Sequence, residues 1–114
     1  MRPTAMVVDD HPSFRRLAGR MLVAAGYDVI AEAADAAHAV TAARDLQPNV
    51  VLLDVMLPDG NGIDIADQLA ASGGIVLLTS SKTADDLGET LERRTFVTKS
   101  ELTVERLARL IQRR

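Results

Sequence analysis

The sequence predicts an α/β domain with a doubly wound parallel sheet that carries helices on both faces. Five short apolar segments alternate with five segments whose apolar residues recur at helical spacing, and the connections between them are short. The apolar segments are hydrophobic at consecutive rather than alternate positions, which is typical of strands buried on both faces. The chain has 114 residues and no linker or repeat, so we expect one domain over residues 1–114.

The first half of the chain contains three of the expected strands and two of the expected helices. Pro12 suits the first turn of a helix, and Gly26 follows the last apolar residue of that helix. The second helix is rich in alanine and ends before Pro48. The expected strands are residues 4–8, 28–33 and 50–54, and the expected helices are residues 12–25 and 36–46.

The second half begins with an expected loop, because a segment rich in glycine and proline, residues 58–62, follows the third strand. Either Ser81 or Thr83 caps the fourth helix, and Thr103 caps the last. The expected strands are residues 75–78 and 96–98, and the expected helices are residues 63–71, about 83–91 and 104–111.

The composition excludes several classes of function. The chain has no cysteine, which excludes disulfides, cysteine-ligated zinc and thiol chemistry. Its three aromatic residues are too few for a stacking platform that binds single-stranded nucleic acid. No apolar run approaches the roughly 18 residues of a membrane span, and the N-terminus lacks the features of a signal peptide. We therefore expect a cytoplasmic protein.

The net charge of −3 is unevenly distributed. Residues 93–114 carry seven basic and two acidic side chains, whereas the rest of the chain carries six basic and fourteen acidic ones. A basic end can contact nucleic acid, but cations at the end of a solvated helix also complement the helix dipole. We favour the second interpretation.

Polar side chains stand where the expected strands end, and ligands bind at this edge in open α/β sheets. Asp9 and Asp10 follow the first strand, and Asp54 ends the third. Thr79 follows the fourth strand and Lys99 follows the fifth. Taken singly, each could be a helix cap, a turn residue or a surface lysine. Their occurrence at the ends of four neighbouring strands favours one shared site.

The chemistry of this set points to phosphoryl transfer. Carboxylates without an arginine among them repel one another unless a cation neutralises them. Oxygen ligands of this kind favour a hard divalent ion, above all Mg²⁺. A lysine and a hydroxyl opposite them suit a phosphoryl group, and a carboxylate beside Mg²⁺ can attack phosphorus. The residues therefore predict a Mg²⁺-dependent site that accepts a phosphoryl group on an aspartate.

Four segments resemble the receiver domain of two-component response regulators: MVVDDHP at 6–12, VLLDVMLPDGNG at 51–62, VLLTS at 76–80 and FVTKS at 96–100. The resemblance covers nearly the whole chain and implies a (βα)5 flavodoxin-like fold with strand order 2-1-3-4-5. The DDHP opening and the segment KSEL at 99–102 resemble the subfamily that usually continues into a LuxR-type helix-turn-helix. We expect residues 1–114 to be the receiver domain, with no effector domain present.

The resemblance implies a role for each polar residue. Asp54 would be the phosphoacceptor, and Lys99 would pair with the phosphoryl group. Asp10 and Asp54 would bind Mg²⁺ directly, together with the main-chain carbonyl of Met56. Asp9 would bind Mg²⁺ through water.

The resemblance also implies a phosphorylation-dependent signalling switch that catalyses only its own phosphorylation and dephosphorylation. Thr79 would turn inward to the phosphoryl group, and Phe96 would change rotamer with it. The surface of the fourth helix, fifth strand and last helix would then control a partner, a dimer or an absent DNA-binding domain, and so transcription. A sensor histidine kinase or phosphotransfer protein would supply the phosphoryl group, docking near the first helix.

Departures from the family pattern support an alternative. Thr79 and Lys99 are 20 positions apart, fewer than the subfamily pattern implies, and Arg93-Arg94-Thr95 replaces the usual turn of small residues. We expect shortened third-helix and fourth-helix regions, which would suit a pseudo-receiver acting as a constitutive interaction module. A metal-dependent phosphatase acting on other substrates is disfavoured, because its acid–base position holds Met56 and no cap insertion is present.

Overall fold

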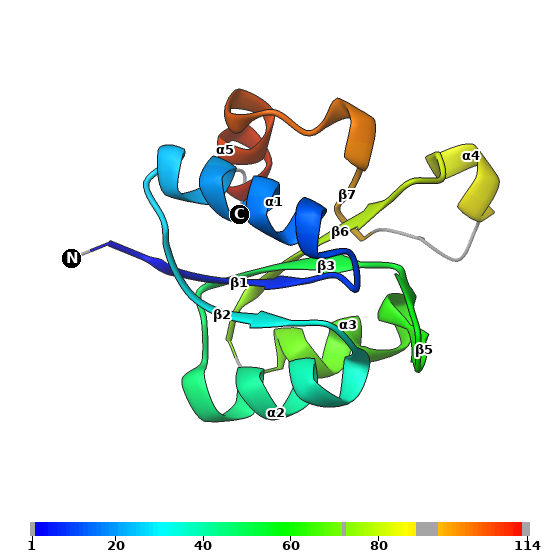
Figure 1. Cartoon of the computed structure of the whole chain (residues 1–114), viewed down its shortest axis with the longest axis horizontal. Helices are drawn as coiled ribbons and strands as arrows, with labels where there is room; N and C mark the ends of the chain where they lie inside the picture. The colour runs from blue at the N-terminus through cyan, green and yellow to red at the C-terminus, as the bar shows by residue number, and fades with distance from the viewer. Residues whose placement is uncertain (1, 72, 89–93, 113–114) are drawn as a thin grey trace.

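The computed structural model describes residues 2–71, 73–88 and 94–112. Five parallel strands form one sheet in the order β2-β1-β3-β6-β7, which confirms the predicted topology (Figure 1). The strands of this sheet are β1 (Thr4–Val8), β2 (Asp28–Ala33), β3 (Val50–Asp54), β6 (Ile75–Ser80) and β7 (Phe96–Thr98).

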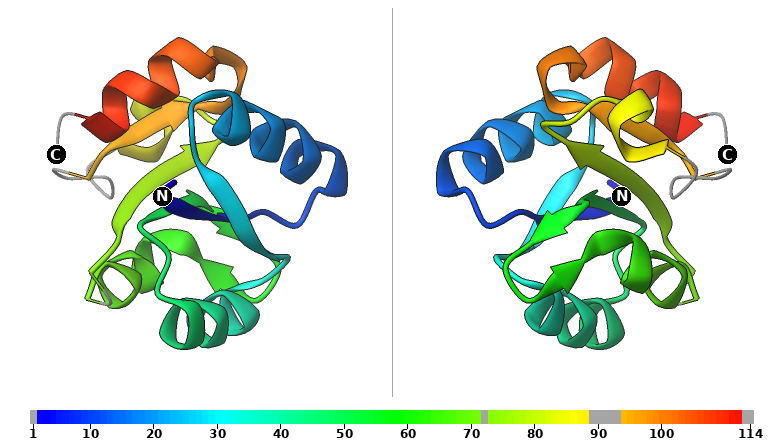
Figure 2. Two further views of the ribbon diagram at one scale, coloured as in Figure 1. Left: turned by 90° about the vertical axis from the view of Figure 1, so that its left-hand side faces the viewer. Right: turned by 90° about the vertical axis from the view of Figure 1, so that its right-hand side faces the viewer.

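Helices cover both faces of the sheet, as predicted. α1 (Pro12–Ala24) and α5 (Val104–Gln112) cover one face, and α2 (Ala36–Leu46) and α3 (Gly62–Ala70) cover the other (Figure 2). The bounds of α2 agree with the prediction because the Asp35 side chain caps its first turn and Gln47 ends it in the left-handed conformation. Lys99–Glu101 forms a short 3₁₀ helix, η2, which was not predicted.

The fourth helix is described only in part. α4 comprises Ala84–Leu87, and the predicted remainder up to Leu91 lies largely outside the described residues. Thr83 is the cap rather than Ser81, because its hydroxyl accepts the Asp86 N–H while the Asp86 carboxylate accepts the Thr83 N–H.

The hydrophobic core has two parts, one on each face of the sheet. Successive residues of a strand point to opposite faces, so Met6 and Val8 pack toward α2 and α3, whereas Ala5 and Val7 pack toward α1 and α5. All four side chains are buried, which accounts for the unbroken apolar run in the sequence. Asp9, directly after this run, is therefore carried at the end of a rigid strand.

Contacts at the opposite edge fix the register of the central strands. The Thr4 N–H donates to Asn49 Oδ1 at 2.8 Å, and the Asn49 N–H donates to Thr4 Oγ1 at 3.1 Å. On the other side of β3, the Ile75 N–H donates to the Asn49 carbonyl at 2.8 Å, and in this register Asp54 pairs with Thr79, the last residue but one of β6. The edge strand β2 contains an irregularity, because Ala5 pairs with Val29 whereas Met6 pairs with Ala31.

The predicted loop after β3 contains a small hairpin, which the sequence analysis missed. β4 (Met56–Leu57) pairs antiparallel with β5 (Gly60–Asn61), with Pro58 and Asp59 at the tip. Asn61 then caps α3 through a bond from the Ile63 N–H at 2.8 Å. Among the described helices, none is both long and apolar enough to cross a bilayer.

Candidate functional site

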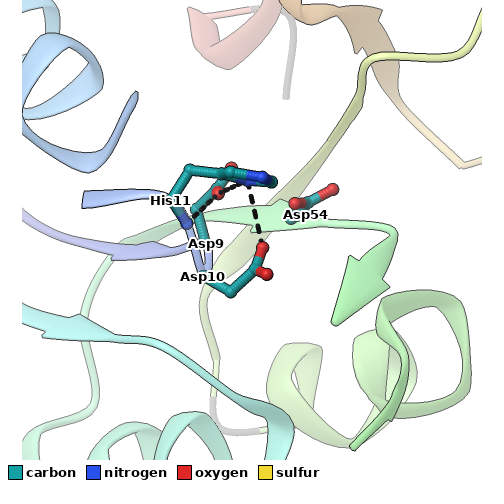
Figure 3. A group of neighbouring side chains, drawn as sticks. All are labelled: Asp9, Asp10, His11 and Asp54. Carbon is teal, nitrogen blue, oxygen red and sulfur yellow. Dashed lines mark hydrogen bonds and ion pairs between the residues drawn. The ribbon is translucent and has the colours of Figure 1, made fainter. Parts of the chain in front are cut away.

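Carboxylates and an imidazole gather at the carboxyl ends of β1 and β3 (Figure 3). One potential ligand atom from each of Asp9, Asp10, His11 and Asp54 lies within 4.8 Å of the others. Asp9 and Asp54 are buried, whereas Asp10 and His11 face solvent. The cluster thus has a buried acidic floor and an open side.

Lys99 links the two buried carboxylates. Its Nζ lies 2.6 Å from Asp9 Oδ2 and 3.2 Å from Asp54 Oδ2. The same ammonium lies 4.5 Å from the centroid of the Phe14 ring, a cation–π contact that the sequence analysis did not predict. Lys99 is placed there because it begins η2 directly after β7.

The buried charges perturb one another. Burial and the negative charge of Asp9 raise the pKa of Asp54 to about 6, although the Met56 N–H and Lys99 act in the opposite direction. Burial lowers the pKa of Lys99, but its contacts with Asp9 and Asp54 outweigh burial, and the pKa is raised. Lys99 is therefore a permanent cation near neutral pH, and Asp54 is an aspartate with unusually strong proton affinity.

Asp9 is held by its own loop and by α1. Its Oδ1 accepts the His11 N–H at 2.8 Å, and His11 Nδ1 lies 3.1 Å from Oδ1 of both Asp9 and Asp10. Arg15 donates from Nη1 to the Asp9 carbonyl at 2.6 Å and from Nε to Glu32 Oε1 at 3.1 Å. Neither the His11 contacts nor the Arg15 contacts follow from the sequence pattern.

Asp54 is positioned by the backbone that follows it. Its Oδ1 accepts the Met56 N–H at 3.1 Å, while the Gly62 N–H donates to the Val55 carbonyl at 2.7 Å. Gly62 lies so close that a Cβ added there would collide with the Asp54 carbonyl oxygen. A glycine at this position therefore allows the start of α3 to pack against the phosphoacceptor candidate.

Thr79 lies beside Asp54 on the neighbouring strand. Its hydroxyl oxygen is buried and has no hydrogen-bond partner within the described part of the chain. A buried hydroxyl without a partner costs about 1–3 kcal/mol, so it is a poised donor for an oxygen that enters the site. Phe96, on β7 opposite Leu78, is half-buried and packs with Leu87 against the core on the α2 side.

The structure brings the predicted residues together to different degrees. Asp9, Asp54 and Lys99 are in direct contact, Asp10 joins the same cluster, and Thr79 is the register partner of Asp54. The set combines oxygen donors suited to a hard cation with an ammonium and a hydroxyl suited to an anion. This arrangement fits a phosphorylated carboxylate beside a divalent metal ion.

Comparisons with known proteins agree with this geometry. Residues 5–112 match the family model described as the response regulator receiver domain. Over 89 residues the chain is 43% identical to the DNA-binding response regulator MtrA of Mycolicibacterium smegmatis, covering 76% of this chain and 39% of MtrA. The chain thus spans well under half the length of that relative.

Solved structures show the same fold. The receiver domain of NarL from Mycobacterium tuberculosis is 26% identical with a TM-score of 0.83, covering 98% of this chain and 94% of that one. A LuxR-family response regulator from Aurantimonas sp. SI85-9A1 is 29% identical with a TM-score of 0.81, covering 100% of this chain and 88% of that one. This chain belongs to the response regulator receiver family.

Proposed function

We propose that the chain is a phosphorylation-controlled switch whose phosphoacceptor is Asp54. The observation that carries this proposal is the environment of Asp54, which combines a buried carboxylate partner, a shared lysine and an unsatisfied hydroxyl at one strand edge. A buried carboxylate with a raised pKa destabilises the folded chain at neutral pH. Such a residue is typical of a functional site, where the chemistry requires it. Residues 1–114 would constitute the receiver domain.

The reaction is a displacement at phosphorus. A carboxylate oxygen of Asp54 attacks the phosphorus of a phosphohistidine or of a small acyl phosphate. The new P–O bond forms as the bond to the donor nitrogen or oxygen breaks, and the donor keeps the electron pair. A histidine nitrogen then takes a proton from water, whereas the carboxylate released from an acyl phosphate leaves as the anion. Lys99, already 3.2 Å from Asp54 Oδ2, would neutralise charge on the phosphoryl oxygens.

The donor set fits Mg²⁺. Asp10, Asp54 and the Met56 carbonyl would hold the ion, with Asp9 contributing through water. When bound, Mg²⁺ would supply positive charge that stabilises the attacking and transferred oxygens. The exposure of Asp10 supports this assignment, because a Mg²⁺ site retains several waters and needs an open side.

Phosphorylation would be transmitted through Thr79 and Phe96. The partnerless Thr79 hydroxyl would bond a phosphoryl oxygen, and Phe96, which lies on β7 opposite Leu78, the residue before Thr79, would respond by changing rotamer. The phosphorylated chain would then favour one of two arrangements of the α4, β7 and α5 surface. The spacing of 20 positions between Thr79 and Lys99, fewer than the family pattern implies, keeps the constitutive pseudo-receiver as the alternative.

The partners follow from the same proposal. A sensor histidine kinase or phosphotransfer protein would donate the phosphoryl group, and a second copy of the chain is a candidate partner for the switched surface. MtrA is named as a DNA-binding response regulator, so transcription control through a DNA-binding domain outside residues 1–114 is the proposed output. A cytoplasmic location is proposed for the same reason.

Labelling tests the proposal. Incubation with acetyl phosphate and Mg²⁺ should add one phosphoryl group, detected by intact mass, and omission of Mg²⁺ should prevent labelling. Asp54→Asn should abolish labelling, whereas Asp64→Asn, an exposed aspartate in the first turn of α3, should not. No mass increase would favour the pseudo-receiver, and turnover of an aryl phosphate would favour the phosphatase.

A further inference from the structure

Asp59, at the tip of the β4–β5 hairpin, binds the N-terminus of α2. Its Oδ1 accepts the Ala36 N–H at 2.7 Å, and its Oδ2 accepts the Ala37 N–H at 3.1 Å. The side chain of the cap residue Asp35 accepts the next amide of the turn, the His38 N–H, at 2.8 Å and also contacts the His38 ring at Nδ1. Asp59 therefore satisfies two of the N–H groups that the first turn of a helix leaves unpaired, from a distant part of the sequence.

The two ends of the hairpin are restrained differently. Its base is fixed by backbone bonds, from the Val55 N–H to the Thr79 carbonyl at 2.8 Å and from the Gly62 N–H to the Val55 carbonyl at 2.7 Å. At the exposed tip, in the part of the chain that the structure describes, the Asp59 carboxylate makes the hydrogen bonds that reach another element. In Figure 1 the hairpin lies next to the end of α2 at which that helix begins.

We propose that Asp59 is a positioning residue for the Mg²⁺ site. By docking the hairpin tip onto α2, it holds Met56, the first residue of β4, in place relative to Asp54. The inference rests on the proposed function, because it takes the Met56 carbonyl as a metal ligand. Residues that orient metal ligands in this way commonly change metal affinity by about 10–100-fold when they are removed.

The contact also couples the site to α2. If the docked hairpin favours Mg²⁺ binding, Mg²⁺ binding must favour the docked hairpin to the same extent. The amides of Ala36 and Ala37 should therefore exchange with solvent more slowly when Mg²⁺ is present. This readout does not depend on phosphorylation.

The experiment compares Asp59→Ala with Asp64→Ala, which removes the same charge from an exposed position in the first turn of α3. Mg²⁺ is titrated while backbone amide resonances of residues 54–57 are followed. We expect the dissociation constant for Mg²⁺ to rise about tenfold in Asp59→Ala and to stay at the wild-type value in Asp64→Ala. Without Mg²⁺, the Ala36 and Ala37 amides should exchange faster in Asp59→Ala only.

Labelling at saturating Mg²⁺ separates positioning from general damage. The acetyl phosphate labelling rate of Asp59→Ala should return to the wild-type rate once Mg²⁺ saturates the site. A Mg²⁺ affinity equal to that of Asp64→Ala, or a rate that stays low at saturation, would overturn the inference. Asp59→Asn keeps one acceptor oxygen and should give an intermediate affinity, and it replaces Asp59→Ala in the test if the alanine variant does not fold.

The outcomes distinguish this inference from the proposed function. A wild-type chain that binds Mg²⁺ but is never labelled contradicts the proposed function, while the Mg²⁺ titration still decides the role of Asp59. Normal wild-type labelling with no effect of Asp59→Ala contradicts the inference alone. A wild-type chain that binds no Mg²⁺ overturns both.

Discussion

The two sides of the site differ in how their polar groups are satisfied. On the β1 and β3 side, Asp9 and Asp54 share the Lys99 ammonium and each accepts a backbone N–H. On the β6 side, the Thr79 hydroxyl is buried without a partner among the described residues. On the proposed function, the first side is assembled before a ligand arrives, and the second would be completed when a phosphoryl oxygen bonds Thr79.

This difference separates chemistry from signalling. Groups that must be in place when phosphorus is attacked gain from being held rigidly in advance. A group that transmits the signal must instead interact more favourably in one phosphorylation state than in the other. On the proposed function, the paired carboxylates would meet the first requirement and Thr79 would meet the second.

Removing Lys99 should have the largest effect on the free energy of unfolding, because Lys99 pairs with both buried carboxylates. Lys99→Ala leaves two buried carboxylates without their cation and should lower the free energy of unfolding by about 3–5 kcal/mol near pH 7.5. The cost should shrink toward pH 5, where Asp54, with its pKa of about 6, is protonated. Urea unfolding at the two pH values measures both, with the exposed Lys82→Ala as the matched control. Equal losses in the two variants would refute the pairing.

Neutralising Asp54 should stabilise the same side. The pKa of Asp54 is about 6 in the folded chain against 3.8 normally, so the folded chain binds more protons than the unfolded chain between these values. Stability due to this group is therefore lost as pH rises from about 4 to about 6, and stays lost above. Asp54→Asn should raise the free energy of unfolding near pH 7.5 by up to about 3 kcal/mol, with no gain near pH 4.

Denaturant unfolding from pH 4 to pH 8 measures this pH dependence. Asp64→Asn serves as the control, because Asp64 is exposed, and its curve should follow the wild type. A stabilisation that is constant across this range would contradict the assigned cause. In the wild type, the labelling rate should also fall at low pH, because protonated Asp54 is a poor nucleophile. Mg²⁺ bound to Asp54 should shift this fall below the metal-free pKa of about 6.

Gly62→Ala should disturb the backbone beneath Asp54. The added methyl group would collide with the Asp54 carbonyl oxygen, and relief requires a backbone shift that we expect to cost about 2 kcal/mol. Gly19→Ala provides the matched comparison, because its Cβ would meet nothing within 4 Å and it lies inside α1. That variant should instead be stabilised by about 1 kcal/mol in thermal or urea unfolding. The same sign for both variants would contradict the packing at Gly62.

Thr79→Val should have the smallest effect on stability, and it tests most directly whether Thr79 transmits the signal. Removing a partnerless hydroxyl should raise the free energy of unfolding by about 1 kcal/mol, the lower end of the cost of such a buried group. The response to beryllofluoride with Mg²⁺, followed through the Phe96 ring resonances, should be lost. Thr41→Val on the exposed face of α2 should keep that response. A preserved response in Thr79→Val would show that Thr79 does not carry the signal.

Local patterns in the sequence were sufficient to predict most of the fold. The side chains of β1 and β3 are buried on both faces of the sheet, so their continuous apolar runs correctly indicated central strands of a parallel sheet. The β4–β5 hairpin was missed because strands of two residues have no period to detect, and a Pro–Asp–Gly sequence is equally typical of a loop. η2 depends on how the chain turns from β7 into α5, which is tertiary information.

The sequence was sufficient to predict which residues converge at the site, but not the contacts that they make with one another. Topology places Asp9, Asp54 and Lys99 at one sheet edge, so their convergence follows from the strand order. The ion pair of Lys99 with Asp9 at 2.6 Å, closer than that with Asp54, depends on side-chain packing beside Phe14. The contact of Asp59 with α2 joins residues more than twenty positions apart, and no local pattern indicates it.

The irregular register of β2 has a consequence for how copies of the chain behave in concentrated solution. An edge strand that exposes a regular row of backbone groups can recruit another strand and start aggregation. In β2 the register shift opposite Ala5 and Met6 interrupts that row, and Asp28 and Glu32 add exposed negative charge. The other edge, β7, spans only Phe96–Thr98. Both edge strands are thus poor templates for strand pairing between molecules. The folded chain should therefore resist aggregation, although the strands at the centre of its sheet are apolar.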